Sequence, residues 1–205
     1  MRTTLTLVLV LFVCSFSTSP AAQEKKPSAK QKDPQSEYEP RSKPGEGQKF
    51  LQKFVGDWGV MKTFYPRSGE PVRQEGECRQ TMIHEGRFLQ SEFTFRRGDD
   101  KTTGTGLIGF DSASGRFTSV WIDSRSTRMS FRQGQEKFDG QQIILYGRQL
   151  GDEGKTGRVS RTVTRLEDDG RRIVHRQYTT GEGGRDRLVM ELILTKKGKE
   201  PSEGK

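Results

Sequence analysis

The feature that most constrains this sequence is a succession of strand-length runs, each ended by turn residues, that extends from Trp58 to Lys196. The runs alternate apolar with polar residues or are rich in β-branched and aromatic residues, and no long helical pattern interrupts them. Glycine and acidic residues separate them, as at Asp139-Gly140 and Asp168-Asp169-Gly170, and such residues favour tight turns. The pattern predicts an all-β fold built from successive antiparallel hairpins.

About ten strands are expected, and hairpin after hairpin favours one up-and-down β-barrel over a sandwich, which needs longer crossings between its sheets. Only 29% of the residues are hydrophobic, which suits a barrel whose strands alternate polar and apolar residues. Before the strands, Gln48–Val55 places apolar residues at helical spacing, and we expect a short helix that closes one end of the barrel. The predicted strands are Trp58–Tyr65, Gly76–Ile83, Arg87–Phe95, Thr103–Phe110, Arg116–Asp123, Thr127–Gln133, Gln135–Phe138, Gln142–Gln149, Arg158–Leu166, Arg171–Thr179 and Arg185–Lys196.

The chain divides into four predicted parts. Residues 1–22 have the pattern of a signal peptide, with Arg2 before a short apolar run and Pro20-Ala21-Ala22 at the end, so we expect export to the periplasm or the exterior. Residues 23–47 are rich in Lys, Glu, Pro, Ser and Gln, and we expect a disordered charged linker there. The barrel is predicted over residues 48–197, with a disordered tail at 198–205.

The net charge of +9 is spread over many arginines. Nucleic-acid binding is not expected, since it calls for clustered basic groups with interleaved aromatic residues; weak attraction to anionic polymers is the expected consequence. Removal of the signal peptide leaves one cysteine, Cys78, which excludes an intramolecular disulfide and is interpreted as a small buried residue. No metal-binding pattern is present, and neither a membrane span nor an oligomeric state is predicted.

In two predicted strands, the alternation indicates which residues share a face of the sheet. Phe117, Ser119, Trp121 and Asp123 alternate along one run, but the opposite face is also apolar, so the periodicity leaves open which face lines the barrel. In the last run, Leu188, Met190, Leu192 and Leu194 are predicted to share a face.

Several strings, in order and spacing, resemble the bacterial "domain of unknown function 1579" family across residues 46–197. They are Phe50–Trp58, Gly86–Gln90, Gly106–Asp111, Phe117, Trp121–Ser124, Met190–Leu192 and Thr195-Lys196. That family is similar to the calycins, which include the lipocalins and fatty-acid-binding proteins. The resemblance therefore implies a calycin-like barrel with an internal cavity. It implies no particular activity, since the family has none agreed.

The string Gly56-Asp57-Trp58 resembles the Gly-x-Trp opening of lipocalins. The resemblance implies that Gly56 and Trp58 form the floor of the barrel. It also implies that an arginine of the last strand packs against the indole, and Arg185 or Arg187 is the predicted partner.

Candidate ligand contacts come from several strands. Trp121 and Asp123 could clamp an apolar body and orient a polar head, or they could be core and turn cap. Arg87 could bind a carboxylate, or pair with a carboxylate of its own turn. Glu92 and Tyr178 complete the set of candidates.

The favoured function is a binding protein for a small lipophilic molecule. One alternative is a hydrolase or isomerase in which Glu92, Asp123 and a histidine meet in the cavity; the other is a non-catalytic interaction module with a filled interior. No catalytic residue is predicted, because the sequence has no Gly-x-Ser-x-Gly elbow and no metal-spaced His or Cys cluster. No cofactor is predicted either, and a dinucleotide is rejected because Gly104, Gly106 and Gly109 lie within a strand. Haem binding through His175 is not favoured, since no group that would orient the imidazole is recognisable.

Overall fold

The computed structural model describes residues 34–39, 41–148, 159–180 and 185–198. The predicted signal peptide lies outside the described residues, as do most of the predicted tail and residues 23–33 and 40 of the predicted linker. The chain separates into two units, residues 1–41 and 42–205. Within the first unit the structure describes one short 3-10 turn, η1, at Pro34–Glu37; the elements below belong to the second.

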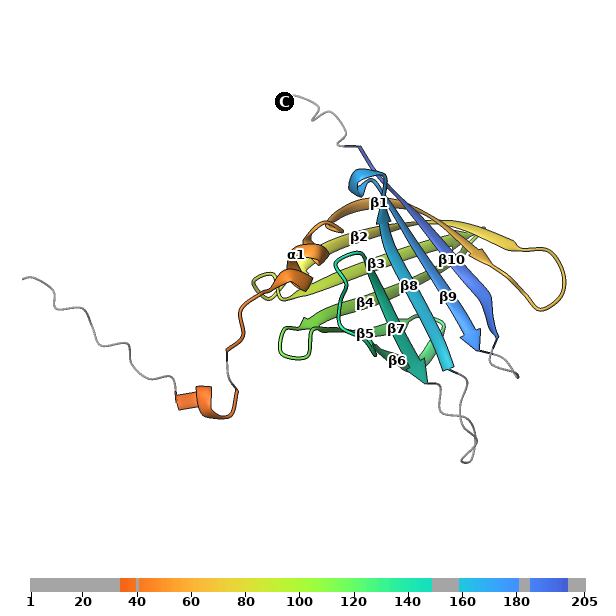
Figure 1. Ribbon diagram of the computed structural model, residues 1–205. Coiled ribbons are helices and arrows are strands. Elements are labelled where there is room, and N and C mark those ends of the chain that lie inside the picture. The colour runs from red at the N-terminus through yellow and green to blue at the C-terminus, as the bar shows by residue number, and fades with distance from the viewer. Residues whose placement is uncertain (1–33, 40, 149–158, 181–184, 199–205) are drawn as a thin grey trace, which may run out of the picture. The chain divides into compact units, whose positions relative to one another are not determined.

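Ten strands pair in the order β1-β10-β9-β8-β7-β6-β5-β4-β3-β2 and close into a barrel, with every neighbouring pair antiparallel (Figure 1). The expected up-and-down barrel with one short helix is confirmed. The elements are α1 Glu46–Gln52, β1 Gly56–Phe64, β2 Val72–Ile83, β3 Phe88–Arg97, β4 Asp100–Asp111, β5 Arg116–Asp123, β6 Ser126–Gln133, β7 Gln142–Arg148, β8 Val159–Glu167, η3 Asp168–Gly170, β9 Arg172–Thr180 and β10 Asp186–Lys196.

The segment Gln135–Phe138 is not a strand, and that prediction is wrong. Phe138 instead packs its ring against Phe117 and Phe50, with ring centroids 4.9 Å apart in both pairs. Its apolar character therefore comes from the core at the end of the barrel. Asp139 contributes to the turn before β7 by accepting hydrogen bonds from the backbone of Gln141 and Gln142.

The last strand changes phase along its length. Leu192 and Leu194 are buried and point inward with Met190, but the pairing of β10 with β9 shifts between Leu188 and Met190. Leu188 then pairs with Tyr178, whose ring lies on the outer surface. The prediction that Leu188 shares the face of the other three is wrong, because a β-bulge inserts one residue and inverts the alternation.

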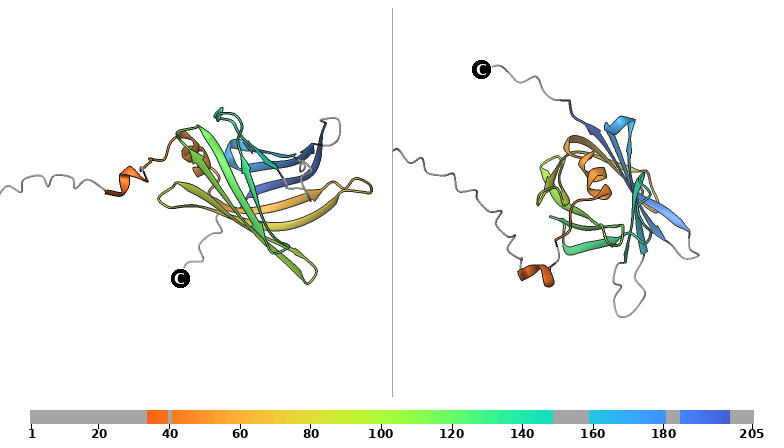
Figure 2. Two further views of the ribbon diagram at one scale, coloured as in Figure 1. Left: turned by 90° about the horizontal axis from the view of Figure 1, so that it is seen from below. Right: turned by 60° about the vertical axis from the view of Figure 1, so that its left-hand side comes forward.

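The helix α1 occupies one end of the ring of strands (Figure 2). It begins at Glu46, where the Gln48 side chain accepts a hydrogen bond from the Gly45 backbone at 2.7 Å and donates one to the Phe110 carbonyl at 2.8 Å. Aromatic rings close this end of the barrel, and they come from α1, from the segment after it, and from β4, β5 and the loop before β7: Phe50, Phe54, Phe110, Phe117 and Phe138.

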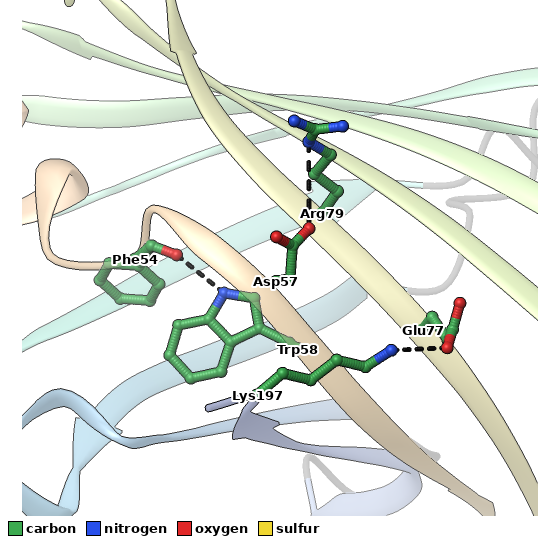
Figure 3. Close-up of polar contacts among 6 residues, drawn as sticks. All are labelled: Phe54, Asp57, Trp58, Glu77, Arg79 and Lys197. Carbon is green, nitrogen blue, oxygen red and sulfur yellow. Dashed lines mark hydrogen bonds and ion pairs between the residues drawn. The ribbon is translucent and has the colours of Figure 1, made fainter. Parts of the chain in front are cut away.

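Trp58 lies beneath this aromatic cluster and is fully buried. Its indole Nε1 donates to the Phe54 carbonyl at 2.9 Å (Figure 3). Gly56, two residues earlier, adopts a φ of +140°, which a side chain would strain, and a Cβ there would lie 3.2 Å from the Lys196 side chain. The two residues thus mark the closed end of the barrel.

The cation beside Trp58 is Lys196, whose Nζ lies 5.4 Å from the ring centroid. The prediction of Arg185 or Arg187 is wrong for a reason of register. Trp58 pairs with Lys196 at the end of β10, whereas Arg187 lies at the other end of the barrel and donates to the Tyr65 carbonyl at 3.0 Å. The neighbouring ion pairs Asp57–Arg79 and Glu77–Lys197 lie on the exposed surface (Figure 3).

Candidate functional site

A cavity of about 550 Å³ lies inside the barrel, and residues of all ten strands contribute to its lining. The aromatic cluster and Trp58 close one end of the barrel. The β5–β6 hairpin, with Asp123 and Arg125, lines the cavity toward the other end. The volume falls within the range of small-molecule sites, about 300–1,000 Å³.

Trp121 faces this cavity, and two glycines of β4 make room for its indole. A Cβ on Gly104 would lie 2.3 Å from the Trp121 ring, and one on Gly106 would lie 3.4 Å from it. Phe93 of β3 packs edge-on against the same ring, with centroids 5.5 Å apart. Two of the three glycines that superficially suggest a nucleotide loop therefore make room for a tryptophan.

Asp123 holds the other edge of the indole, since Trp121 Nε1 donates to Asp123 Oδ2 at 2.8 Å. Asp123 Oδ1 also accepts from the Arg125 backbone N–H at 2.9 Å. Burial alone would raise the pKa of this carboxyl, but the hydrogen bonds from Trp121 and from the turn outweigh it and keep the pKa below its ordinary value. Asp123 is thus both a turn cap and a charged group of the cavity wall.

Lys62 of β1 is a buried cation in the same cavity, with 7% of its surface exposed. Its Nζ lies 3.6 Å from the centroid of the Phe95 ring, so the aromatic face provides part of its stabilisation. Burial is the main cause that lowers the pKa of Lys62; Arg125 lowers it further and Asp123 opposes the shift. No described carboxylate lies within ion-pair distance of Lys62.

Arg132 and His175 line a second part of the cavity. Arg132 is on β6 opposite Ser119, and its Nε is buried with no hydrogen-bond partner among the residues that the structure describes. His175 is on β9, and its Nδ1 lies 2.8 Å from the Thr164 hydroxyl of β8. Burial, with a smaller contribution from the nearby Arg132 charge, lowers the pKa of His175 to about 4, so this imidazole is neutral at physiological pH.

Three predicted ligand contacts lie outside the cavity. Arg87 pairs with Glu85 of its own turn at 2.7 Å and contacts the His84 and Ser42 carbonyls, at the closed end of the barrel. Glu92 is exposed, because the neighbouring residues of β3 are the ones that face inward. Tyr178 lies on the outer surface, where the Arg161 guanidinium stacks 4.5 Å from the centroid of its ring.

Sequence reasoning missed Lys62 and Arg132. A signal for Lys62 exists, since it follows Trp58 by four residues and β1 alternates from Trp58 to Lys62, with Trp58, Val60 and Lys62 all buried. Arg132 has no comparable signal, because the pairing of β5 with β6 is irregular between Trp121 and Asp123, so alternation cannot be counted back from the hairpin.

Neither a metal-binding cluster nor a membrane-spanning helix is found in the described part of the chain. No group of three or more His, Cys, Asp or Glu side chains there could hold a metal ion. None of the described helices is both long enough and apolar enough to cross a membrane.

The closed barrel, its aromatic floor and its internal cavity define a calycin-like β-barrel. The chain belongs to the family described as "Protein of unknown function (DUF1579)", whose model matches residues 43–196.

Two solved structures are similar to this barrel. One is Rv2717c from M. tuberculosis, with a TM-score of 0.54, 15% identity, and coverage of 76% of this chain and 100% of that one. The other is the S-type phycobiliprotein lyase CPES from Guillardia theta, with a TM-score of 0.49, 8% identity, and coverage of 75% and 94%. At 15% identity, the similarity to Rv2717c shows the fold alone. A search of curated proteins found no match to this chain.

Proposed function

We propose that this protein is an exported binding protein that holds a small lipophilic molecule inside its barrel. The observation that carries the proposal is the cavity of about 550 Å³, in which aromatic side chains such as Phe93, Phe95 and Trp121 form one wall. Such a surface releases ordered water when an apolar molecule covers it, and that release favours binding.

The sequence of residues 1–22 supports the exported part of the proposal, because it combines a basic start, a short apolar run and small residues at its end. The ligand would therefore be met in the periplasm or outside the cell.

The two alternatives have less support. Acid–base catalysis by paired carboxylates needs both groups in one cavity, but Glu92 points out of the barrel, and Asp123 is the one carboxylate among the described lining residues. An interaction module with a filled interior would not need the open volume.

A fluorescent uncharged probe, 1-aminoanthracene, tests the proposal on the purified chain. Ser119 faces the cavity and Thr118, its neighbour on β5, faces outward, so Ser119→Phe fills the cavity and Thr118→Phe is the matched control. We expect the wild type and Thr118→Phe to bind the probe and Ser119→Phe to bind at least tenfold more weakly. The proposal is overturned if the wild type binds no probe, or if the two variants lose binding equally.

Native mass spectrometry of chain purified without denaturation gives an independent measurement. A retained small molecule, lost in Ser119→Phe and kept in Thr118→Phe, is the expected result. An identical adduct in both variants would place the bound molecule outside the barrel.

A further inference from the structure

We propose that the cavity selects amphiphiles with a carboxylate head group and that Arg132 is the residue that determines this specificity. The inference deepens the proposed function and rests on it. It comes from the way in which the barrel places one guanidinium, one neutral imidazole and a wall of aromatic rings around the same volume.

The chain leaves space for the Arg132 side chain to cross the inner face of β7. Gly147 lies there, and a Cβ at that position would be 2.9 Å from Arg132 Cγ and 3.1 Å from the Ser160 hydroxyl. Any larger residue would block the path of the arginine between β6 and β8. The guanidinium is thus carried into the cavity, where its Nε has no hydrogen-bond partner among the described residues.

His175 adds a second polar group near this arginine. The Thr164 hydroxyl, at 2.8 Å from Nδ1, can donate to that nitrogen and so leave the hydrogen of the neutral ring on Nε2, as a donor. Gln177 and Thr162, the next inward-facing pair of β9 and β8, also line the cavity. The β6–β9 side of the barrel therefore offers hydrogen-bond donors.

The opposite side of the barrel is mainly aromatic, and the Lys62 cation there already lies over the Phe95 ring. The strand order places β3 across the ring from β8, and Phe93 and Phe95 of β3 face inward as a stacked pair, with centroids 6.0 Å apart. Trp121 extends this aromatic wall. A ligand that satisfies both sides has a polar head and an apolar body.

The charges of the lining favour an anionic head. The cations of the cavity lining are Lys62, Arg125 and Arg132, and Asp123 is the one carboxylate among the described lining residues. Asp123 is already bound by Trp121 and by the turn, and no described carboxylate forms an ion pair with Arg132. A planar guanidinium matches a carboxylate, because two parallel N–H groups can donate to its two oxygens.

Displacement of bound 1-aminoanthracene by decanoate and decanol tests the inference, because these competitors share an apolar chain and differ in charge. Decyl phosphate tests the other common anionic head group. The variants are Arg132→Met, which removes the charge and keeps much of the stem, and Arg132→Lys, which keeps the charge without the paired donors. Arg128→Met on the same strand is the control, because Arg128 is exposed and does not line the cavity.

We expect the wild type and Arg128→Met to bind decanoate at least tenfold more tightly than decanol. A charge-assisted hydrogen bond stabilises a complex more than a neutral one does, and the difference corresponds to about a factor of ten in affinity. Arg132→Met should lose this preference and retain decanol, which shows that the barrel is intact, and Arg132→Lys should retain only part of it. Equal affinity for decanoate and decanol in the wild type, or an unchanged preference in Arg132→Met, overturns the inference but leaves the proposed function standing. Tighter binding of decyl phosphate than of decanoate overturns the carboxylate assignment. A wild type that binds none of these compounds, nor the uncharged probe, overturns the proposed function itself.

Discussion

Substitution of Gly104 by alanine should destabilise the barrel and reshape its cavity. The added Cβ would lie 2.3 and 2.5 Å from two carbons of the Trp121 ring, far inside van der Waals contact. The indole must then move, and its hydrogen bond to Asp123 at 2.8 Å must lengthen or break. Overpacking of this kind costs about 1–3 kcal/mol of unfolding free energy.

Gly106→Ala is the matched control, because it adds the same methyl group to the same strand beside the same ring. Its Cβ would lie 3.4 Å from Trp121, an ordinary contact. Alanine also loses less backbone entropy than glycine on folding, which favours the variant by about 0.5–1 kcal/mol. We expect Gly106→Ala to match or exceed the stability of the wild type, and Gly104→Ala to be about 1–3 kcal/mol less stable than Gly106→Ala.

Urea unfolding followed by fluorescence measures this difference, since Trp58 and Trp121 are the two tryptophans of the chain. The probe affinity should also fall in Gly104→Ala and persist in Gly106→Ala. Equal stability and equal probe affinity in the two variants would show that β4 does not seat the indole as described.

Three further predictions concern buried groups. Burial lowers the pKa of His175 to about 4, below its ordinary value of 6.5, so stability should fall as pH drops from about 6.5 to 4, by up to roughly 3 kcal/mol; an NMR titration of His175 near its ordinary pKa would contradict this. Trp58→Phe leaves the Phe54 carbonyl without its donor and should cost about 1–3 kcal/mol, seen as a lower melting temperature; an unchanged one would refute that role. Burial raises the pKa of Cys78 to about 12, so a thiol reagent should modify Cys78 only after denaturation, and rapid modification of Cys78 in the native protein would count against it.

Local features of this sequence predicted most of the fold, whereas contacts between distant residues decided the remainder. Turn residues and strand-length runs are local, and they correctly predicted a closed antiparallel barrel with a short helix. The pairing of Trp121 and Asp123 on one face also followed from the two-residue period of a strand. The predicted strand Gln135–Phe138 was wrong, because an apolar side chain such as Phe138 that packs into the end of a barrel looks the same in the sequence as one in a short strand.

The sequence by itself determined the antiparallel up-and-down order of the strands, the Gly56–Trp58 end of the barrel, and the residues that share a face along regular strands. Only the tertiary structure decided which face of β5 lines the cavity, because both faces are apolar and only closure of the ring gives them an inside. It also decided that Arg132 crosses Gly147 toward β8 and that the bulge in β10 turns Leu188 outward. Those features depend on contacts between strands far apart in the chain, and a strand's own alternation contains no record of its distant neighbours.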